Sequence, residues 1–172
     1  MEKEKKVIVL GANGMLGHVV SRYLKKHVNV YRVYNLARNI KTSDSNISVD
    51  LLDFEALKKV IISLKPNIII NCAGLLVKDS LGKPSKAILT NSYIPHYLNE
   101  MSFEYDYKLI HISTDCVFSG KKGNYDESSH KDETNYYGLS KNLGEIINDK
   151  NLTIRTSIIG PELKANGTGL LH

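Results

Sequence analysis

The stretch Val7-Ile8-Val9-Leu10-Gly11-Ala12-Asn13-Gly14-Met15-Leu16-Gly17 decides the fold of this chain. Its first four residues are all aliphatic, which is typical of a parallel strand that is buried on both faces. Three glycines follow at every third position, and apolar residues then recur at helical spacing as far as Leu24. A strand, a glycine turn and a helix in this order can bind the pyrophosphate of a dinucleotide, because the first N–H groups of the helix face the anion.

Each glycine of this turn has its own expected role. Gly11 allows the tight turn, Gly14 allows the backbone to approach the pyrophosphate, and Gly17 allows the helix to pack closely on the strand. The spacing G-x-x-G-x-x-G differs from G-x-G-x-x-G, and three glycines also suit a plain structural turn, but their place between a strand and a helix favours the dinucleotide. The expected contacts from this segment are Gly11, Asn13, Gly14, Met15, Leu16 and Gly17.

Length and composition limit the classes of protein to consider. The chain has 172 residues, of which 42% are hydrophobic and 24% charged, as expected for a soluble globular protein with a single domain. The net charge of +5 comes from scattered lysine pairs without a long basic run, so we expect no nucleic-acid partner. No stretch is long enough to span a membrane, and the start lacks the apolar core of a signal peptide, so we expect no membrane partner and a cytoplasmic location.

Cysteine and histidine offer no obvious chemistry of their own. The two cysteines, Cys72 and Cys116, make no disulfide framework. His111 lies in a predicted strand, and no second ligand follows at the spacing that a metal site needs. We therefore expect His111 to be a packed or surface-facing residue, and we expect no metal.

The rest of the chain alternates strand and helix patterns. Expected strands cover residues 7–10, 30–36, 47–49, 67–71, 108–113 and 152–159. Helices are expected to begin near Met15, after the N-cap Asp53, and at Ser85, the last of these with a kink or break at Pro95. A further helix is expected from residue 136 to residue 149. Residues 115–135 form a long polar loop, which in a compact domain is usually functional or mobile. The alternation predicts an α/β fold, namely a single Rossmann-type doubly wound parallel sheet in the order 3-2-1-4-5-6.

The end of the second expected strand indicates which dinucleotide binds. An NAD-binding fold carries Asp or Glu there for the ribose 2′-hydroxyl, but this chain has Arg38, with Lys41 close behind. A guanidinium pairs bidentately with phosphate oxygens, which favours the 2′-phosphate of NADP, whereas the structural alternative is a surface arginine in a loop. We expect NADP(H) as the preferred cofactor and NAD(H) as the alternative.

Two further strand ends are expected to contact the cofactor. Asp50 and Leu51 follow the third strand, where the Asp50 carboxylate could accept a hydrogen bond from the adenine amino group. Ala73 and Gly74 follow the fourth strand, where small side chains leave room for the cofactor. Turn chemistry explains either segment equally well, so both interpretations remain open.

Three polar residues at the same edge of the sheet suggest catalysis. Thr114 ends the fifth strand, and Tyr137 and Lys141 lie four residues apart, on one face of a helix. A lysine ammonium would lower the pKa of the phenol from its usual value of about 10 and could also bind ribose hydroxyls. Thr114 would orient a substrate carbonyl or hydroxyl. Alone, Tyr-x-x-x-Lys is common on ordinary helices, but the glycine turn and the Ser/Thr strand end favour catalysis.

Four segments in this order resemble the extended short-chain dehydrogenase/reductases, and within them the dTDP-4-dehydrorhamnose reductase branch. They are residues 11–17, 71–74, 113–120 and 137–141, and the resemblance extends from residue 7 to about residue 160. It implies NAD(P)H-dependent reduction of a 4-keto nucleotide sugar in deoxysugar or surface polysaccharide biosynthesis, and it allows a homodimer. It also implies that Thr114, Tyr137 and Lys141 are catalytic and that Asn91, Tyr137 and Lys141 contact the cofactor. Cys116 departs from the family's usual tyrosine, which affects substrate contacts.

The resemblance also implies a second domain. Family members continue into a smaller domain that binds the nucleotide sugar, so we expect residues 1–160 to be the NAD(P)-binding domain and 161–172 to begin a substrate domain that is largely missing. Cofactor binding without efficient turnover is then expected. One alternative is a nucleotide-sugar epimerase or dehydratase, since Asp115 follows Thr114. Another is a non-catalytic NADP-binding regulatory subunit.

Overall fold

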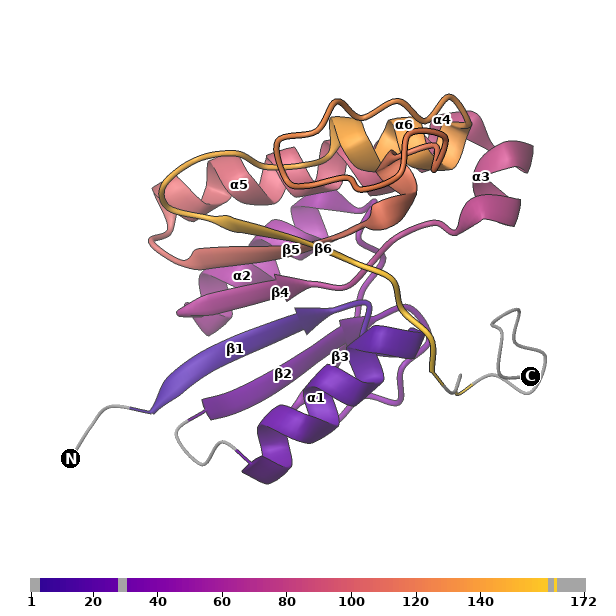
Figure 1. Cartoon of the computed structure of the whole chain (residues 1–172). Coiled ribbons are helices and arrows are strands. Elements are labelled where there is room, and N and C mark those ends of the chain that lie inside the picture. The colour runs from indigo at the N-terminus through magenta and orange to yellow at the C-terminus, as the bar shows by residue number, and fades with distance from the viewer. Residues whose placement is uncertain (1–3, 28–30, 161–162, 164–172) are drawn as a thin grey trace.

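The computed structural model describes residues 4–27, 31–160 and 163, and within them six parallel strands form one sheet (Figure 1). The order of the strands is β3-β2-β1-β4-β5-β6, which confirms the predicted Rossmann-type arrangement. The strands are β1 (Lys5–Leu10), β2 (Tyr31–Ala37), β3 (Asn46–Ser48), β4 (Ile68–Asn71), β5 (Lys108–Thr114) and β6 (Leu152–Thr156). Because all of them run parallel, their carboxyl ends meet at one edge, where such sheets bind their ligands.

Helices cover both faces of this sheet (Figure 1). The α-helices are α1 (Met15–His27), α2 (Phe54–Leu64), α3 (Val77–Gly82), α4 (Pro84–Ala87), α5 (Ile94–Glu104) and α6 (Tyr136–Leu143). A π-helix, η1 (Ile88–Tyr93), joins α4 to α5, and a 3₁₀ turn, η2 (Asp115–Val117), follows β5. Asp53 caps α2 as predicted, since its carboxylate accepts a hydrogen bond from the N–H of Ala56 at 3.0 Å. None of the described helices is both long and apolar enough to cross a membrane.

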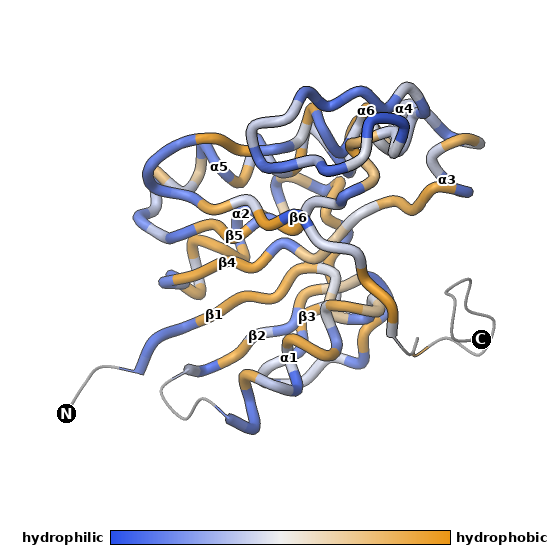
Figure 2. Tube along the Cα trace, viewed as in Figure 1, coloured by the Kyte–Doolittle hydropathy of each residue, from blue (hydrophilic) through white to orange (hydrophobic). Residues whose placement is uncertain are grey.

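Strand β1 is buried on both sides, as its run of aliphatic residues predicts. Ile8 and Leu10 belong to the larger core cluster, which α2 and α5 complete with Leu57 and Leu98 among others. Val9 faces the other way, into a smaller cluster that Val20 and Leu24 of α1 cover. The same concentration of apolar residues along the central strands is visible in Figure 2.

The helix expected from Ser85 is divided into three parts. It consists of α4, the π-helix η1 and α5, and Pro95, which has no N–H to donate, lies in the first turn of α5 directly after η1. The chain stays helical on both sides of Pro95, so the predicted break is wrong; a π-helix, a form frequently found at functional sites, precedes Pro95 instead. The short helix α3 before it has no predicted counterpart.

Two predicted boundaries are wrong. The last helix is expected to reach residue 149, but α6 ends at Leu143 with Gly144, a poor helix former, as its C-cap. Gly144 lies against the backbone of Asn91, where any Cβ would collide with the Asn91 carbonyl oxygen. The chain then turns so that Glu145 reaches Arg155 on β6. The sixth strand ends at Thr156 and not at residue 159. Of the expected substrate-domain segment 161–172, all but residue 163 lies outside the described residues.

Candidate cofactor and catalytic site

The glycine turn has the close contacts that its sequence predicts. Gly11 adopts a φ of +72°, and a Cβ there would lie 2.8 Å from the backbone nitrogen of Ala73. A Cβ on Gly17 would collide with the carbonyl oxygen of Gly11, so only glycine lets α1 start this close to β1. Helix α1 begins at Met15, and the N–H groups of its first turn have no partner within the helix. The turn therefore offers hydrogen-bond donors and a positive helix end to an anion.

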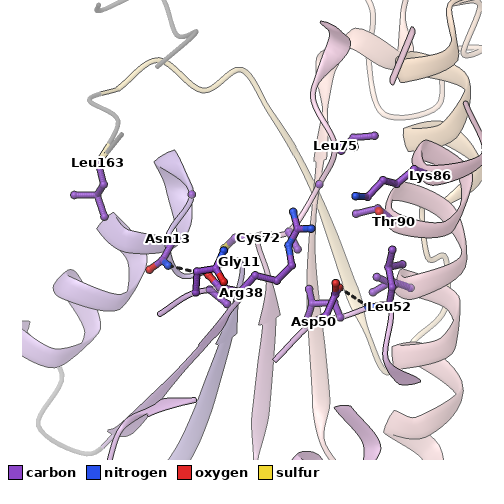
Figure 3. A pocket seen from close by; sticks show the side chains of 17 residues that line it. Gly11, Asn13, Arg38, Asp50, Leu52, Cys72, Leu75, Lys86, Thr90 and Leu163 are labelled. Atoms are coloured by element: carbon purple, nitrogen blue, oxygen red, sulfur yellow. Dashed lines mark hydrogen bonds between the residues drawn. The ribbon is translucent and has the colours of Figure 1, made fainter. Parts of the chain in front are cut away.

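A cavity of about 700 Å³ opens beside this turn, at the carboxyl ends of the central strands (Figure 3). Its volume lies within the range usual for ligand and cofactor sites. Eight residues predicted to bind the cofactor line it: Gly11, Asn13, Gly14, Arg38, Asp50, Leu51, Ala73 and Gly74. The lining omits six others that were predicted with them: Met15, Leu16, Gly17, Asn91, Tyr137 and Lys141.

Other lining residues were not predicted from the sequence. They are Ala37, Asn39, Leu52, Cys72, Leu75, Lys86, Thr90, Ile94 and Leu163. Lys86, Thr90 and Ile94 follow one another at intervals of four residues, a spacing that places side chains on one helix face and that could have indicated this wall. Burial raises the pKa of the Cys72 thiol to about 12, so Cys72 contributes a neutral wall and not a nucleophile.

The charged side chains of the cavity are Arg38, Asp50 and Lys86. The carbonyl of Arg38 accepts a hydrogen bond from the Asn13 side chain at 3.4 Å, which ties the second strand end to the glycine turn. Asp50 accepts a hydrogen bond from the N–H of Leu52 at 3.0 Å. Within residues 4–27, 31–160 and 163, no ion pair engages either Arg38 or Lys86. Both cations are thus available to an anionic ligand.

The three predicted catalytic residues gather at the neighbouring strand end. Thr114 closes β5 and caps η2, since its hydroxyl oxygen accepts a hydrogen bond from the N–H of Cys116 at 3.1 Å. The same hydroxyl donates a hydrogen bond to the Asp115 carboxylate at 3.2 Å, and it acts to lower the pKa of the neighbouring Tyr137 phenol. Gly138 makes this approach possible, because a Cβ there would lie 2.5 Å from the carbonyl oxygen of Cys116.

Lys141 does not act on Tyr137 as the sequence predicts. Its side chain is buried, and its Nζ donates a hydrogen bond to the carbonyl of Ile112 at 2.7 Å. Burial lowers the pKa of Lys141 to about 8. Burial also raises the pKa of the Tyr137 phenol, which the Thr114 hydroxyl partly offsets. The prediction of a lowered pKa for Tyr137 is therefore wrong in this structure.

Glu145 is a buried charge in this region that sequence reasoning missed. Its side chain is 2% exposed and accepts two hydrogen bonds from Arg155, both at 2.8 Å, and one from the Ser113 hydroxyl at 2.8 Å. Lys131 adds an ion pair at 2.8 Å, and these partners hold the pKa of the carboxyl at about 2 in spite of its burial. The only available signal was its position four residues after Lys141.

Asn91 connects the two parts of the site without lining the cavity. Its amide oxygen accepts a hydrogen bond from the N–H of Leu75 at 2.7 Å, and its amide nitrogen donates to the Leu75 carbonyl and to the Ser140 hydroxyl, both at 3.0 Å. Because Leu75 lines the cavity and Ser140 lies on α6, Asn91 fixes the catalytic helix to the cavity wall.

His111 is a packed residue, in keeping with the interpretation of its strand. It is fully buried, and its Nδ1 lies 3.2 Å from the amide nitrogen of Asn71 on β4. Burial lowers its pKa well below the usual range for histidine, so the ring is neutral. In the part of the chain that the structure describes, no three His, Cys, Asp or Glu side chains gather as metal ligands would.

Comparison with known proteins identifies the family. The family model of the RmlD substrate binding domain matches residues 5–167. The chain belongs to this family. A dTDP-4-dehydrorhamnose reductase from Aggregatibacter actinomycetemcomitans is 30% identical over 88% of this chain and 51% of its own length. A methionine adenosyltransferase 2 subunit beta from Danio rerio is 31% identical over 82% of this chain and 42% of its own length. The chain thus spans about half the length of the curated relatives it matches.

Solved structures of the same family share the fold. A hypothetical dTDP-4-dehydrorhamnose reductase from Sulfolobus tokodaii is 36% identical and superposes with a TM-score of 0.78 over 88% of this chain and 55% of its own. The dTDP-4-dehydrorhamnose reductase from Bacillus anthracis, solved with NADP, is 27% identical with a TM-score of 0.74 over 88% and 53% of the two chains. The resemblance indicated by the sequence motifs is therefore confirmed.

Proposed function

We propose that this chain is the cofactor-binding and catalytic part of an NADP(H)-dependent reductase that acts on a 4-keto nucleotide sugar in deoxysugar or surface polysaccharide biosynthesis. The observation that carries the proposal is that α6, which bears Tyr137 and Lys141, is fixed to β5 by the Lys141–Ile112 hydrogen bond beside Thr114, at a strand end next to the cavity. The relatives named as dTDP-4-dehydrorhamnose reductases support the reaction, and the one solved with NADP supports the cofactor.

The cavity suits a phosphorylated dinucleotide. Gly11 and Gly17 keep the backbone of the turn free of side chains, and the start of α1 supplies donors for a pyrophosphate. Arg38 supplies a cation at the second strand end, where the fold places the adenosine ribose. NAD(H), which lacks the 2′-phosphate, remains the alternative cofactor.

When bound, the nicotinamide supplies a hydride for the keto carbon of the sugar. In our proposal, Tyr137 donates a proton to the alkoxide that develops on the keto oxygen, while the Thr114 hydroxyl holds that oxygen. The high pKa of the Tyr137 phenol keeps it protonated and able to donate. Lys141 would hold ribose hydroxyls, and its pKa of about 8 leaves it mostly charged at pH 7.

Titration with NADPH and NADH tests the cofactor assignment. We expect the wild-type chain to prefer NADPH and the Arg38→Ala variant to lose about tenfold or more of that preference, since one charge-assisted hydrogen bond accounts for about 1.5 kcal/mol. Lys41→Ala is the matched control, because Lys41 is a nearby exposed cation outside the cavity lining. Equal affinities of the wild type for the two nucleotides would contradict the 2′-phosphate assignment.

Stopped-flow measurement of NADPH oxidation with a 4-keto nucleotide sugar tests the reaction. Because the chain spans about half of its relatives' length, we expect cofactor binding with inefficient turnover, and any turnover should fall at least about a hundredfold in Tyr137→Phe. Turnover that Tyr137→Phe leaves intact would refute the catalytic assignment. Efficient turnover by the wild type would refute the expectation that a second domain is needed.

A second candidate is a non-catalytic NADP-binding subunit. It is favoured by the relatives named methionine adenosyltransferase 2 subunit beta, at 29–31% identity. The presence of Thr114, Tyr137 and Lys141 together argues for the reductase. Recovery of a stoichiometric enzyme partner with the chain would favour the subunit.

An epimerase or dehydratase would instead retain tightly bound NAD on purification.

A further inference from the structure

We propose that Lys86 is a specificity-determining residue, which binds the ribose 2′-phosphate of NADP from the side of the cavity opposite to Arg38. The inference rests on the proposed cofactor and extends it, because the sequence pattern pointed only to Arg38, with Lys41 as a neighbouring cation. Lys41 does not line the cavity, whereas Lys86, 48 positions along the chain from Arg38, does.

The helical segment after β4 directs Lys86 into the cavity. Lys86 lies on α4, Thr90 in the π-helix η1 and Ile94 at the start of α5, and all three line the same wall. In Figure 3 the Lys86 side chain extends from this wall toward the side on which Arg38 projects into the cavity. The two cations thus enter one space from separate elements.

The balance of charges in the cavity favours a dianionic ligand group between Arg38 and Lys86. Arg38 and Lys86 are two cations against the single carboxylate of Asp50, and no ion pair among the described residues neutralises either of them. Asp50 is partly occupied by the N–H of Leu52. A 2′-phosphate carries a charge of about −2 near neutral pH, with several acceptor oxygens, so it can bind both cations at once.

The competing site for Lys86 is the pyrophosphate, which NADPH and NADH share. The structure already provides another set of donors for that group, at the glycine turn and the start of α1. A lysine on the pyrophosphate would strengthen the binding of both nucleotides equally. A lysine on the 2′-phosphate strengthens only the binding of NADPH, so the two positions are separable by measurement.

Calorimetric titration of the 172-residue chain with NADPH, NADH and 2′,5′-ADP tests the proposal. We expect Lys86→Ala to weaken NADPH and 2′,5′-ADP binding about tenfold and NADH binding less than twofold. Lys86→Arg should retain the preference for NADPH. Lys83→Ala is the matched control, because Lys83 is an exposed lysine just before α4 and does not line the cavity.

A double-mutant cycle with Arg38→Ala tests whether both cations bind one group. We expect the double variant to lose less NADPH affinity than the product of the two single losses, since the phosphate is already displaced once one cation is gone. Equal losses for NADPH and NADH in Lys86→Ala, or no loss for either, would overturn the role of Lys86 while leaving the proposed function intact. A wild type that binds neither nucleotide would overturn the proposed function, and the role of Lys86 with it.

Discussion

The cofactor cavity and the catalytic group, which consists of Thr114, Tyr137 and Lys141, differ in whether their charged side chains have partners within the protein. In the cavity, Arg38 and Lys86 have no ion-pair partner among the residues that the structure describes. In the catalytic group, Lys141 is bonded to the Ile112 carbonyl, and the nearby Glu145 is bonded to Arg155, Lys131 and Ser113. The cavity can therefore gain strong interactions from a ligand, whereas the catalytic group is held in place by the protein itself.

This difference separates the residues that set affinity from those that set geometry. Changes in the cavity should alter ligand binding with little effect on folding, because no ion pair within the described part of the chain engages its cations. Changes among the charged residues that support the catalytic group, such as Glu145, should alter folding stability more than ligand affinity, because these charges are buried and paired. The four predictions below test this separation, from the largest expected effect to the smallest.

Glu145→Gln should destabilise the fold most. The substitution leaves Arg155 and Lys131 without their shared counter-charge, and breaking a buried ion pair in this way costs about 3 kcal/mol or more. Urea unfolding followed by circular dichroism measures the loss. Glu100→Gln is the control, since Glu100 is exposed and should change the free energy of unfolding by less than about 0.5 kcal/mol. Equal stability of the two variants would show that the Glu145 cluster does not support the fold.

The contribution of Glu145 should depend on pH. Its pKa is about 2 in the fold and about 4.5 when unfolded, so the charged form stabilises the fold fully above pH 4.5 and this stabilisation is lost as the pH falls toward 2. The difference in free energy of unfolding between wild type and Glu145→Gln should therefore be constant from pH 5 to 7 and shrink below that range. Denaturant titrations at several pH values measure it, and a difference that stays constant down to pH 3 would contradict the depressed pKa.

The sequence predicted the sheet and most of the cavity because both depend on local patterns. The aliphatic run of β1, the glycines after it and Arg38 each act through neighbours in the chain or through a strand end whose position the topology dictates. Lys86 and Glu145 were missed because their positions depend on packing between segments that are distant in the sequence. Lys86 reaches the cavity only because η1 and α5 pack on the sheet, and Glu145 faces Arg155 only because α6 stops at Gly144.

The pKa of Tyr137 was mispredicted for a related reason. Spacing places Lys141 on the same helix face as Tyr137, but it does not reveal that the Ile112 carbonyl receives the ammonium or that Thr114 is the neighbour of the phenol. Tertiary contacts, which the Tyr-x-x-x-Lys spacing does not specify, therefore determine the pKa of Tyr137.

Gly138→Ala should have the next largest effect, because it changes the geometry of the catalytic group. The new Cβ would lie 2.5 Å from the Cys116 carbonyl oxygen, so α6 must move away from η2, at a cost of about 1–3 kcal/mol in stability. Affinity for NADPH should change less than twofold. Gly82→Ala is the control, because a Cβ on Gly82 meets nothing within 4 Å. If Gly138→Ala weakened NADPH binding as strongly as it weakened folding, the cavity and the catalytic group would not be separate.

Tyr137→Phe should have the smallest effect on binding. Tyr137 does not line the cavity, and the Thr114 hydroxyl that lowers the pKa of its phenol belongs to the catalytic group, so we expect NADPH affinity within about twofold of wild type and a change in stability of about 1 kcal/mol or less. Fluorescence titration with NADPH measures the affinity, with Arg38→Ala as the variant that must lose it under the same conditions. A loss in Tyr137→Phe as large as that in Arg38→Ala would show that the phenol contributes as much to cofactor affinity as a cation of the cavity, against the expected division between affinity and geometry.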